Sequence, residues 1–309
     1  MLLVSSWDSN VRVYDVMKDS VEVTWSQSSP ILDCCFGENS NSIFSGGLDM
    51  AVKMYDVTNK QEITLGKHTK PVKCVEYCKE ERLVVTGSWD GTVKLWDLRS
   101  SSEVGTCTQP GKVFTMALTG KRVIVGTSTR QVWIWDLVRL AEPEQRRESS
   151  LKYQTRCIRA FVEGDGYALS STEGRVAMEY FDPNPQIQAK KYAFKCHRLK
   201  SNNGLENVYP VNTLSFHPTF GTFASGGDDG IVNIWDGKNK KRLCQFRKYP
   251  NSIASCAFNY DGSLLAIASS YTFFEGEKEN APENIFIRHI NELEVKPKSR
   301  QPLHTKPPL

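Results

Sequence analysis

Short apolar and β-branched runs alternate with polar turns along nearly the whole chain. In the clearest stretch, such runs occupy Val72–Tyr77, Leu83–Thr86 and Val93–Trp96, and a weaker run follows at Glu103–Cys107. Runs of this length and composition are typical of β-strands joined by tight turns. The pattern predicts an antiparallel unit of four strands, which we name A, B, C and D in chain order.

This unit repeats along the sequence. Aspartates that close an apolar run ending in Tyr-Asp or Trp-Asp recur at intervals of 41 residues, and three more continue the series: Asp15, Asp56, Asp97, Asp136, Asp182 and Asp236. A second series runs seven residues ahead of the first: Asp8, Asp49 and Asp90. A period of about 40 to 45 residues with this ending is typical of four-stranded propeller blades. The sequence therefore predicts an all-β, seven-bladed WD-repeat β-propeller, with blades at residues 1–27, 28–66, 67–107, 108–150, 151–204, 205–247 and 248–290.

Both ends of the series depart from the four-strand unit. Residues 2–8 match strand B and the B–C turn, so the first blade has no strand A. The last blade offers Ile253–Phe258, Leu264–Ser269 and Ile285–Ile290 but no strand D. We expect that part of the first blade and the strand that closes the ring are missing at the N-terminus. Residues 1–290 are expected to form the propeller, and residues 291–309 a basic, proline-containing tail without order.

Composition narrows the class of protein. The 309 residues carry a net charge of +4, contain no apolar run long enough to span a membrane, and begin with too few apolar residues for a signal peptide. The nine cysteines fall mostly on expected strands, where a free thiol packs as a small apolar group. Cys74 and Cys78 lack a companion pair at zinc spacing. We expect no metal, no cofactor and a reducing compartment, nucleus or cytosol.

A catalytic triad is suggested by His68, Ser88 and Asp90, but a structural interpretation is preferred. In a propeller, such a histidine, a strand-B hydroxyl, the turn aspartate and Trp96 of strand C would form a hydrogen-bonded set that holds the blade together. A nucleophile would need a strained turn such as Gly-x-Ser-x-Gly, which the chain lacks, and no phosphate-binding or dinucleotide motif is present. The sequence predicts a protein that is not an enzyme.

The fifth blade carries arginines on its innermost strand. Alignment of the A strands places Arg156 and Arg159 in two columns that are otherwise apolar: Ile31, Val72, Val113, Val211 and Ile253 for the first, and Cys34, Val75, Met116, Leu214 and Cys256 for the second. A buried guanidinium is costly unless it is paired. A carboxylate should therefore meet these arginines, either from a ligand or from this chain, where the candidates are Glu148, Glu173 and Glu179.

More basic and aromatic residues are expected on one face. Arg175 precedes strand C where the other blades carry Asn10, Ala51, Thr92, Gln131 and Ile231. Arg198 lies in the long segment before the sixth blade, and Trp7 and Trp89 lie in B–C turns. B–C turns and D–A connections share one face of a propeller. Exposed aromatic rings beside arginines predict a binding surface for acidic, partly apolar peptides.

Several segments carry a family resemblance that covers residues 2–300. They include Val-Thr-Gly-Ser-Trp-Asp-Gly-Thr-Val-Lys-Leu-Trp-Asp at 85–97, Glu-Gly-Arg-Val-Ala-Met-Glu-Tyr at 173–180 and Tyr-Ala-Phe-Lys-Cys-His-Arg at 192–198. The chain resembles the mitotic-checkpoint WD-repeat proteins of the Bub family. The resemblance implies a nuclear and cytoplasmic adaptor, monomeric as a ring, that acts at kinetochores in mitosis. Its implied partners are a checkpoint kinase and its paralogue through GLEBS-type motifs, a phosphorylated kinetochore scaffold with Met-Glu-Leu-Thr repeats, and an inhibitor assembly of the anaphase-promoting complex.

The same resemblance implies roles for individual residues. Arg156 and Arg175, with Arg159 nearby, match the surface that pairs with glutamates of the GLEBS-type motif. Trp7, Arg175 and Arg198 match the phosphopeptide site, to which the exposed aromatic pattern adds Trp89. An alternative is the related nuclear mRNA-export WD-repeat protein, which binds a GLEBS-type motif of a nucleoporin and contacts RNA. A third is a nucleic-acid platform built on the lysine clusters, whose affinity would fall steeply with salt.

Overall fold

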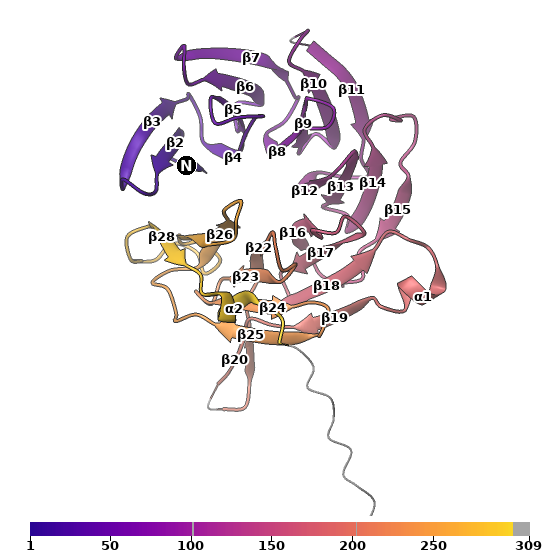
Figure 1. Ribbon diagram of the computed structural model, residues 1–309, viewed down its shortest axis with the longest axis vertical. Coiled ribbons are helices and arrows are strands. Elements are labelled where there is room, and N and C mark those ends of the chain that lie inside the picture. The colour runs from indigo at the N-terminus through magenta and orange to yellow at the C-terminus, as the bar shows by residue number, and fades with distance from the viewer. Residues whose placement is uncertain (101, 202, 299–309) are drawn as a thin grey trace, which may run out of the picture.

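The computed structural model describes residues 1–100, 102–201 and 203–298. Over these residues seven antiparallel sheets stand side by side in a ring (Figure 1). Five of the sheets have four strands, and the first and last have three. The predicted seven-bladed propeller is confirmed. Its strands also follow the expected order, because in the four-stranded sheets strand A lies nearest the ring centre and strand D farthest from it (Figure 1).

The strand bounds can be given by position in the blade. The A strands are β4 (Ile31–Phe36), β8 (Val72–Cys78), β12 (Val113–Thr119), β16 (Thr155–Ala160), β22 (Val211–Phe216) and β26 (Ile253–Phe258). The B strands are β1 (Leu2–Ser5), β5 (Ser42–Gly47), β9 (Leu83–Ser88), β13 (Arg122–Thr127), β17 (Gly166–Ser171), β23 (Phe223–Gly227) and β27 (Leu264–Ser269). The C strands are β2 (Asn10–Asp15), β6 (Ala51–Asp56), β10 (Thr92–Asp97), β14 (Gln131–Asp136), β18 (Arg175–Tyr180), β24 (Val232–Asp236) and β28 (Asn284–His289). The D strands are β3 (Ser20–Ser26), β7 (Gln61–Lys67), β11 (Ser102–Thr108), β15 (Gln145–Glu148), β19 (Tyr192–Lys195) and β25 (Lys241–Gln245).

The repeated aspartates shape the turns at the two ends of strand C. The carboxylate of Asp56 accepts backbone N–H groups of Thr58 and Asn59 at 2.8 and 3.0 Å, which fixes the turn into strand D. At the other end, the carboxylate of Asp90 accepts the N–H of Thr92 at 2.8 Å. Aspartate favours such positions because its short side chain can satisfy backbone donors that a turn leaves free. The aspartates recur in the sequence because the same turns, held by the same hydrogen bonds, recur in several blades.

The core consists of apolar layers between neighbouring sheets. Val85 and Leu95 of the third sheet belong to the same buried cluster as Val113 and Trp135 of the fourth. Side chains alternate across each strand, so each sheet contributes one face to each neighbour. No single sheet could bury both faces alone, and the ring is stabilised by contacts between adjacent blades.

The two three-stranded sheets lie next to each other in the ring. As expected, the first sheet lacks strand A and the last lacks strand D within the described residues. No hydrogen-bonded strand pair joins β1–β3 to β26–β28 in this part of the chain.

The expectation of disorder is wrong for the start of the C-terminal segment. Residues 292–295 form a short helix, α2 (Glu292–Val295), which begins at a capping box on Asn291. Val295 is buried, and its carbonyl accepts the hydroxyl of Thr222 at 2.7 Å. Helix α2 thereby packs on the sixth sheet. Residues 299–309 of the predicted tail lie outside the described residues.

Two elements interrupt the blade pattern without having been predicted. Helix α1 (Pro185–Gln188) lies between strands C and D of the fifth sheet. A separate hairpin of β20 (Arg198–Lys200) and β21 (Glu206–Val208) lies between the fifth and sixth sheets and projects from the ring (Figure 1). In the described part of the chain, both helices are far too short to cross a membrane.

Candidate functional site

The B–C turns and the D–A connections together form one face of the ring, which we call the loop face. Its B–C segments are residues 6–9, 48–50, 89–91, 128–130, 172–174, 228–231 and 270–283. Its D–A segments are residues 27–30, 68–71, 109–112, 149–154, 196–210 and 246–252. The longest connections, 196–210 and 270–283, lie on either side of the sixth sheet. This face holds Trp7 and Trp89, and Arg156, Arg175 and Arg198 lie at or next to its segments.

The predicted alignment of the fifth A strand is wrong by one residue. Thr155 pairs with Ser171 and Cys157 with Ser170, so Arg156 is the extra residue of a β-bulge. Every complete sheet has this bulge: Leu32, Lys73, Phe114 and Asn212 stand at the same place in β4, β8, β12 and β22. Thr155 and Ile158, not the arginines, occupy the columns of buried residues. A shift of one residue moves each side chain to the other face of a strand.

Arg156 is half-buried and lacks a partner. Its Nε is buried, and no hydrogen bond or ion pair involves its side chain within the described residues. In the part of the chain that the structure describes, Glu148, Glu173 and Glu179 each pair with another cation and not with Arg156. Leaving a buried guanidinium nitrogen without an acceptor is costly, so the side chain is suited to receive a carboxylate from outside the chain.

Arg175 and Arg198 meet at Glu173. Nε of Arg175 lies 3.4 Å from a carboxylate oxygen of Glu173, and Arg198 donates to the Glu173 carbonyl at 2.7 Å. Arg198 also forms a 2.9 Å ion pair with Glu206 of β21. In both arginines, however, Nε is buried without a hydrogen-bond acceptor in the described structure. These two arginines therefore form one partly neutralised cluster beside Arg156, at the same end of the fifth sheet.

The indoles of Trp7 and Trp89 differ in their exposure to solvent. Trp7 is 69% exposed on the first sheet and makes an accessible apolar surface. Trp89 was expected to face solvent but is half-buried, with its Nε1 buried and without an acceptor among the described residues. The arginine cluster lies on the fifth sheet and the β20–β21 hairpin. All the predicted site residues except Arg159 therefore share the loop face, but they do not form one compact cluster.

Comparisons with known proteins point to one family. The family described as WD domain, G-beta repeat, matches residues 20–56, 59–97 and 196–236. The mitotic checkpoint protein BUB3.1 of Arabidopsis thaliana is 56% identical over 304 residues, covering 97% of this chain and 89% of that protein. The mitotic checkpoint protein bub3 of Dictyostelium discoideum is 48% identical over 300 residues, covering 96% and 90%. The chain belongs to the Bub3 family of mitotic checkpoint proteins. Protein RAE1 of Arabidopsis thaliana is more distant, at 39% identity over 311 residues, covering 97% and 87%.

In this Bub3-family chain, Arg159 lies away from the loop face. It lines a cavity of about 570 Å³ together with Asp33 and Glu76. Its Nη1 donates to the carbonyls of Ile158 and Met116 at 3.0 and 3.3 Å. Burial raises the pKa of the Glu76 carboxyl to about 7, against the opposing effect of the Arg159 charge. Arg159 thus balances the acidic lining of the ring interior, which favours an internal role over contact with a partner.

Replacing Glu76 tests this internal charge balance. Because the pKa of Glu76 is about 7 in the folded protein and 4.5 in the reference state, its ionisation destabilises the fold: the stability present below pH 4.5 is lost as pH rises through 7. We expect Glu76→Gln to stabilise the protein by about 2 kcal/mol at pH 8 and by little at pH 4. Urea unfolding at both values measures this. The exposed Glu80→Gln is the control, and equal gains at both pH values would contradict the prediction.

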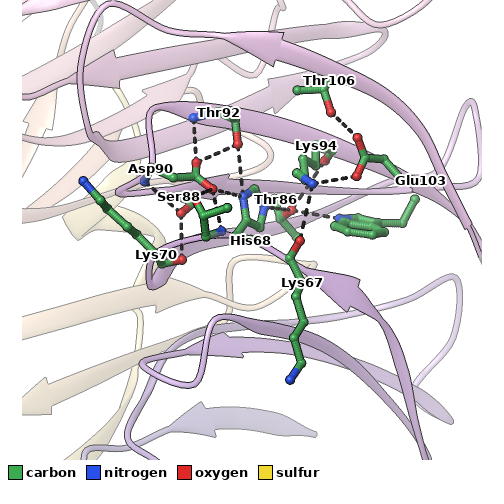
Figure 2. Close-up of polar contacts among 12 residues, drawn as sticks. Lys67, His68, Lys70, Thr86, Ser88, Asp90, Thr92, Lys94, Glu103 and Thr106 are labelled. Atoms are coloured by element: carbon green, nitrogen blue, oxygen red, sulfur yellow. Dashed lines mark hydrogen bonds and ion pairs between the residues drawn. The ribbon is translucent and has the colours of Figure 1, made fainter.

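The triad-like residues form the structural network that was predicted (Figure 2). Nδ1 of His68 lies 3.0 Å from the Asp90 carboxylate, and Nε2 lies 2.8 Å from the Thr86 hydroxyl. The same hydroxyl accepts the Nε1–H of Trp96 at 2.8 Å. The strand-B hydroxyl in contact with the histidine is that of Thr86, whereas Ser88 donates to the carbonyl of Lys70 at 2.9 Å. Histidine and serine are therefore not arranged as base and nucleophile.

The sixth sheet repeats the network with different residues. His197 contacts Asp229 at 2.9 Å and Ser225 at 2.8 Å, and Ser225 accepts the Nε1–H of Trp235 at 2.8 Å. This second network holds the segments that carry Arg198, next to His197, and Asp228, next to Asp229. Asp228 was not predicted as a site residue from the sequence. It stands next to Asp229 in a turn, where aspartates are common for structural reasons. Over the described residues, no His, Cys, Asp and Glu side chains are grouped to hold a metal.

Proposed function

We propose that this Bub3-family chain is a non-enzymatic adaptor of the mitotic spindle checkpoint. It binds GLEBS-type motifs of a checkpoint kinase and of its paralogue, and phosphorylated Met-Glu-Leu-Thr repeats of a kinetochore scaffold. This brings its partners together at unattached kinetochores and in the inhibitor assembly of the anaphase-promoting complex. The proposal places the protein in the nucleus and cytoplasm, and at kinetochores in mitosis.

One observation carries the proposal: on the loop face, the guanidinium of Arg156 has a buried Nε and no partner among the residues that the structure describes. A partner glutamate can form a charge-assisted pair there without first displacing a carboxylate of this chain. Arg175 and Arg198 extend the basic surface from the same end of the fifth sheet. Calorimetric titration with a GLEBS-type peptide is the direct test, in which the wild-type protein should bind and Arg156→Ala should bind more weakly.

The mRNA-export function is the alternative within the fold. Its support is the 39% identity to Protein RAE1 and the 34% identity to mRNA export factor GLE2 of Chaetomium thermophilum, against 56% and 48% for two checkpoint proteins. Both functions would use the loop face for an acidic motif. RNA contact would make the binding constant depend on salt. Its logarithm would fall linearly with the logarithm of the salt concentration, with a slope proportional to the number of phosphates neutralised.

The phosphopeptide part of the proposal predicts a preference that depends on Arg175. A phosphothreonine adds about 1.5 to 2 negative charges, which a guanidinium can meet with two hydrogen bonds. We expect Arg175→Ala to lose about tenfold in affinity for a phosphorylated repeat peptide and nothing for the unphosphorylated one. Because Glu206 competes for Arg198, Glu206→Gln should bind the phosphorylated form more tightly than wild type. Fluorescence polarisation of paired peptides at two salt concentrations measures both effects.

Lys240→Ala is the matched control for bulk charge. Lys240 is exposed between β24 and β25, at the other end of the sixth sheet from the loop face, and its loss should leave both affinities unchanged. Trp7→Ala should weaken both peptide forms, because an exposed indole contributes apolar contact and not phosphate recognition. Equal losses from Lys240→Ala and Arg175→Ala would mean that general positive charge, and not a site, binds the peptide.

A further inference from the structure

Asp228 is a buried carboxylate that is only half satisfied. It lies in the B–C turn of the sixth sheet and is 6% exposed. Its Oδ1 accepts the side-chain N–H of Asn212 at 2.7 Å and the hydroxyl of Thr272 at 2.6 Å. Its Oδ2 is buried and has no hydrogen-bond partner among the described residues. A buried carboxylate oxygen normally accepts at least one hydrogen bond, so this one is suited to an additional donor.

Asn212 presents a second unpaired acceptor in contact with the first group. Its Nδ2 donates to Asp228 and, at 3.0 Å, to the carbonyl of Ile253, which fixes the orientation of the amide. Its Oδ1 is then left buried without a donor in the described structure. Asp228 and Asn212 therefore present acceptors with no donor to match. A cationic group with several N–H bonds is the chemical complement of this arrangement.

A cavity of about 310 Å³ adjoins Asp228 on the loop face, and we call it the Asp228 pocket. Tyr209, Tyr271 and Phe274 line it. The chain's own Lys278 places its Nζ 4.8 Å from the Tyr271 ring centre and 5.6 Å from that of Phe274, so these faces already accept an ammonium group. Aromatic faces attract cations through their quadrupole. The pocket thus combines cation-binding faces with a carboxylate oxygen in need of a donor.

The other charged groups near the pocket are largely paired. Asp229 is held by His197, and Glu275 pairs with Lys278. Lys248 and Glu279 also line the pocket and oppose each other in sign. Among the described residues that line the pocket, Asp228 is thus the buried carboxylate with an oxygen that lacks a partner.

We propose that the Asp228 pocket receives a lysine or arginine side chain of the partner peptide. This inference rests on the proposed function, because it concerns the same face. Asn212 and Arg156 occupy the same bulge position in the A strands β22 and β16, which are neighbours around the ring (Figure 1). An extended peptide that crosses these two strands would place a glutamate at Arg156 and a basic residue at Asp228. The pair of sites selects a peptide with both charges and rejects one that is only acidic.

The inference can be tested without a partner peptide. Nα-acetyl-lysine N-methylamide is titrated into the full chain, and the side-chain amide signal of Asn212 is followed by NMR, with Asn212→Asp used to assign that signal. We expect a saturable shift with this probe and with its arginine counterpart. The uncharged norleucine counterpart should bind at least tenfold more weakly. Equal responses to lysine and norleucine, or none to either, would overturn the inference.

Two variants separate a binding role from a structural one. Asp228→Asn keeps the shape and removes the charge and the unpaired acceptor, so we expect the lysine response to be lost while the melting temperature is unchanged or higher. Asp261→Asn, an exposed turn residue of the seventh sheet, should change neither. A lower melting temperature for Asp228→Asn with the lysine response intact would show that Asp228 is purely structural. Arg156→Ala should leave the lysine probe bound, so a failure of the proposed glutamate contact can be told apart from a failure here.

Discussion

Arg156→Ala should weaken binding of a GLEBS-type peptide by about 2–5 kcal/mol, or roughly 30-fold to several thousand-fold in Kd. The reason lies in the geometry of the free protein. Arg156 is half-buried at a β-bulge and has no acceptor for its buried Nε in the described structure, so its charge is unpaired before the peptide arrives. Its removal leaves the partner glutamate desolvated and without a counter-charge in the complex. Isothermal titration calorimetry at fixed salt measures the change.

The variant should fold as well as the wild type. Because Arg156 makes no ion pair or hydrogen bond within the described residues, its removal costs no internal polar contact, and the melting temperature should hold or rise. Arg139→Ala is the matched control, since Arg139 is exposed in the turn after strand C of the fourth sheet, away from the loop face. Unchanged peptide affinity in a folded Arg156→Ala protein would remove the carboxylate contact from the proposal.

The sequence was sufficient to predict the ring and most of its strands. Strand bounds such as Ile253–Phe258 and Leu264–Ser269 are observed as predicted, because two-residue alternation and turn aspartates are local signals. The network of His68, Asp90 and Trp96 could also be predicted, since a histidine, a turn aspartate and a strand-C tryptophan also stand together in the sixth sheet. A local sequence signal that recurs in several blades therefore predicts the fold well.

The register of the fifth A strand was not predicted correctly because a bulge adds one residue without a sequence signal. Arg156 and Arg159 were placed in apolar columns that Thr155 and Ile158 occupy. The error changed the interpretation of Arg159 most, since that side chain lines the ring interior beside Glu76. The bulge residue of each blade is variable in kind, from leucine to lysine to asparagine, and only the paired strand shows where the extra residue lies.

The Asp228 pocket was beyond sequence reasoning for a different reason. Asp228, Asn212 and Thr272 come from three separate segments, and the unpaired acceptors appear only when all their neighbours are placed. The acidic stretch at 275–279 matches no strand of the repeat and carries no motif that points to a function. In the fold, its residues Glu275 and Lys278 line a wall of the pocket. Whether a buried polar atom finds a hydrogen-bond partner from a distant segment leaves no periodic pattern along the sequence.

Asp90→Ala should destabilise the protein by about 3–5 kcal/mol at pH 7, as expected when one member of a buried polar network is removed. Burial lowers the pKa of His68, which favours the neutral ring, and the Asp90 carboxylate can only accept, so Nδ1 is the nitrogen that carries the proton. The Thr86 hydroxyl can then donate to Nε2 of His68 while it accepts from Trp96. Without Asp90, the Nδ1–H of His68 and the backbone N–H of Thr69 lose their acceptor.

The pH dependence of unfolding and the coupling between two variants test whether the network causes the loss of stability in Asp90→Ala. Burial opposes ionisation of Asp90, but hydrogen bonds from Thr92 and Thr69 outweigh it and lower its pKa from 3.8 to about 2. The contribution of the Asp90 carboxylate to folding stability is therefore present above pH 3.8 and is lost as pH falls through 2. The Asp90→Ala protein should not show this loss. Thr86→Val should cost less after Asp90→Ala than before it, because both act through His68. Urea unfolding gives these values, with the exposed turn residue Asp182→Ala as control. Additive losses, or a loss from Asp90→Ala no larger than from Asp182→Ala, would mean that these contacts do not act as one unit in holding the B–C turn that carries Trp89.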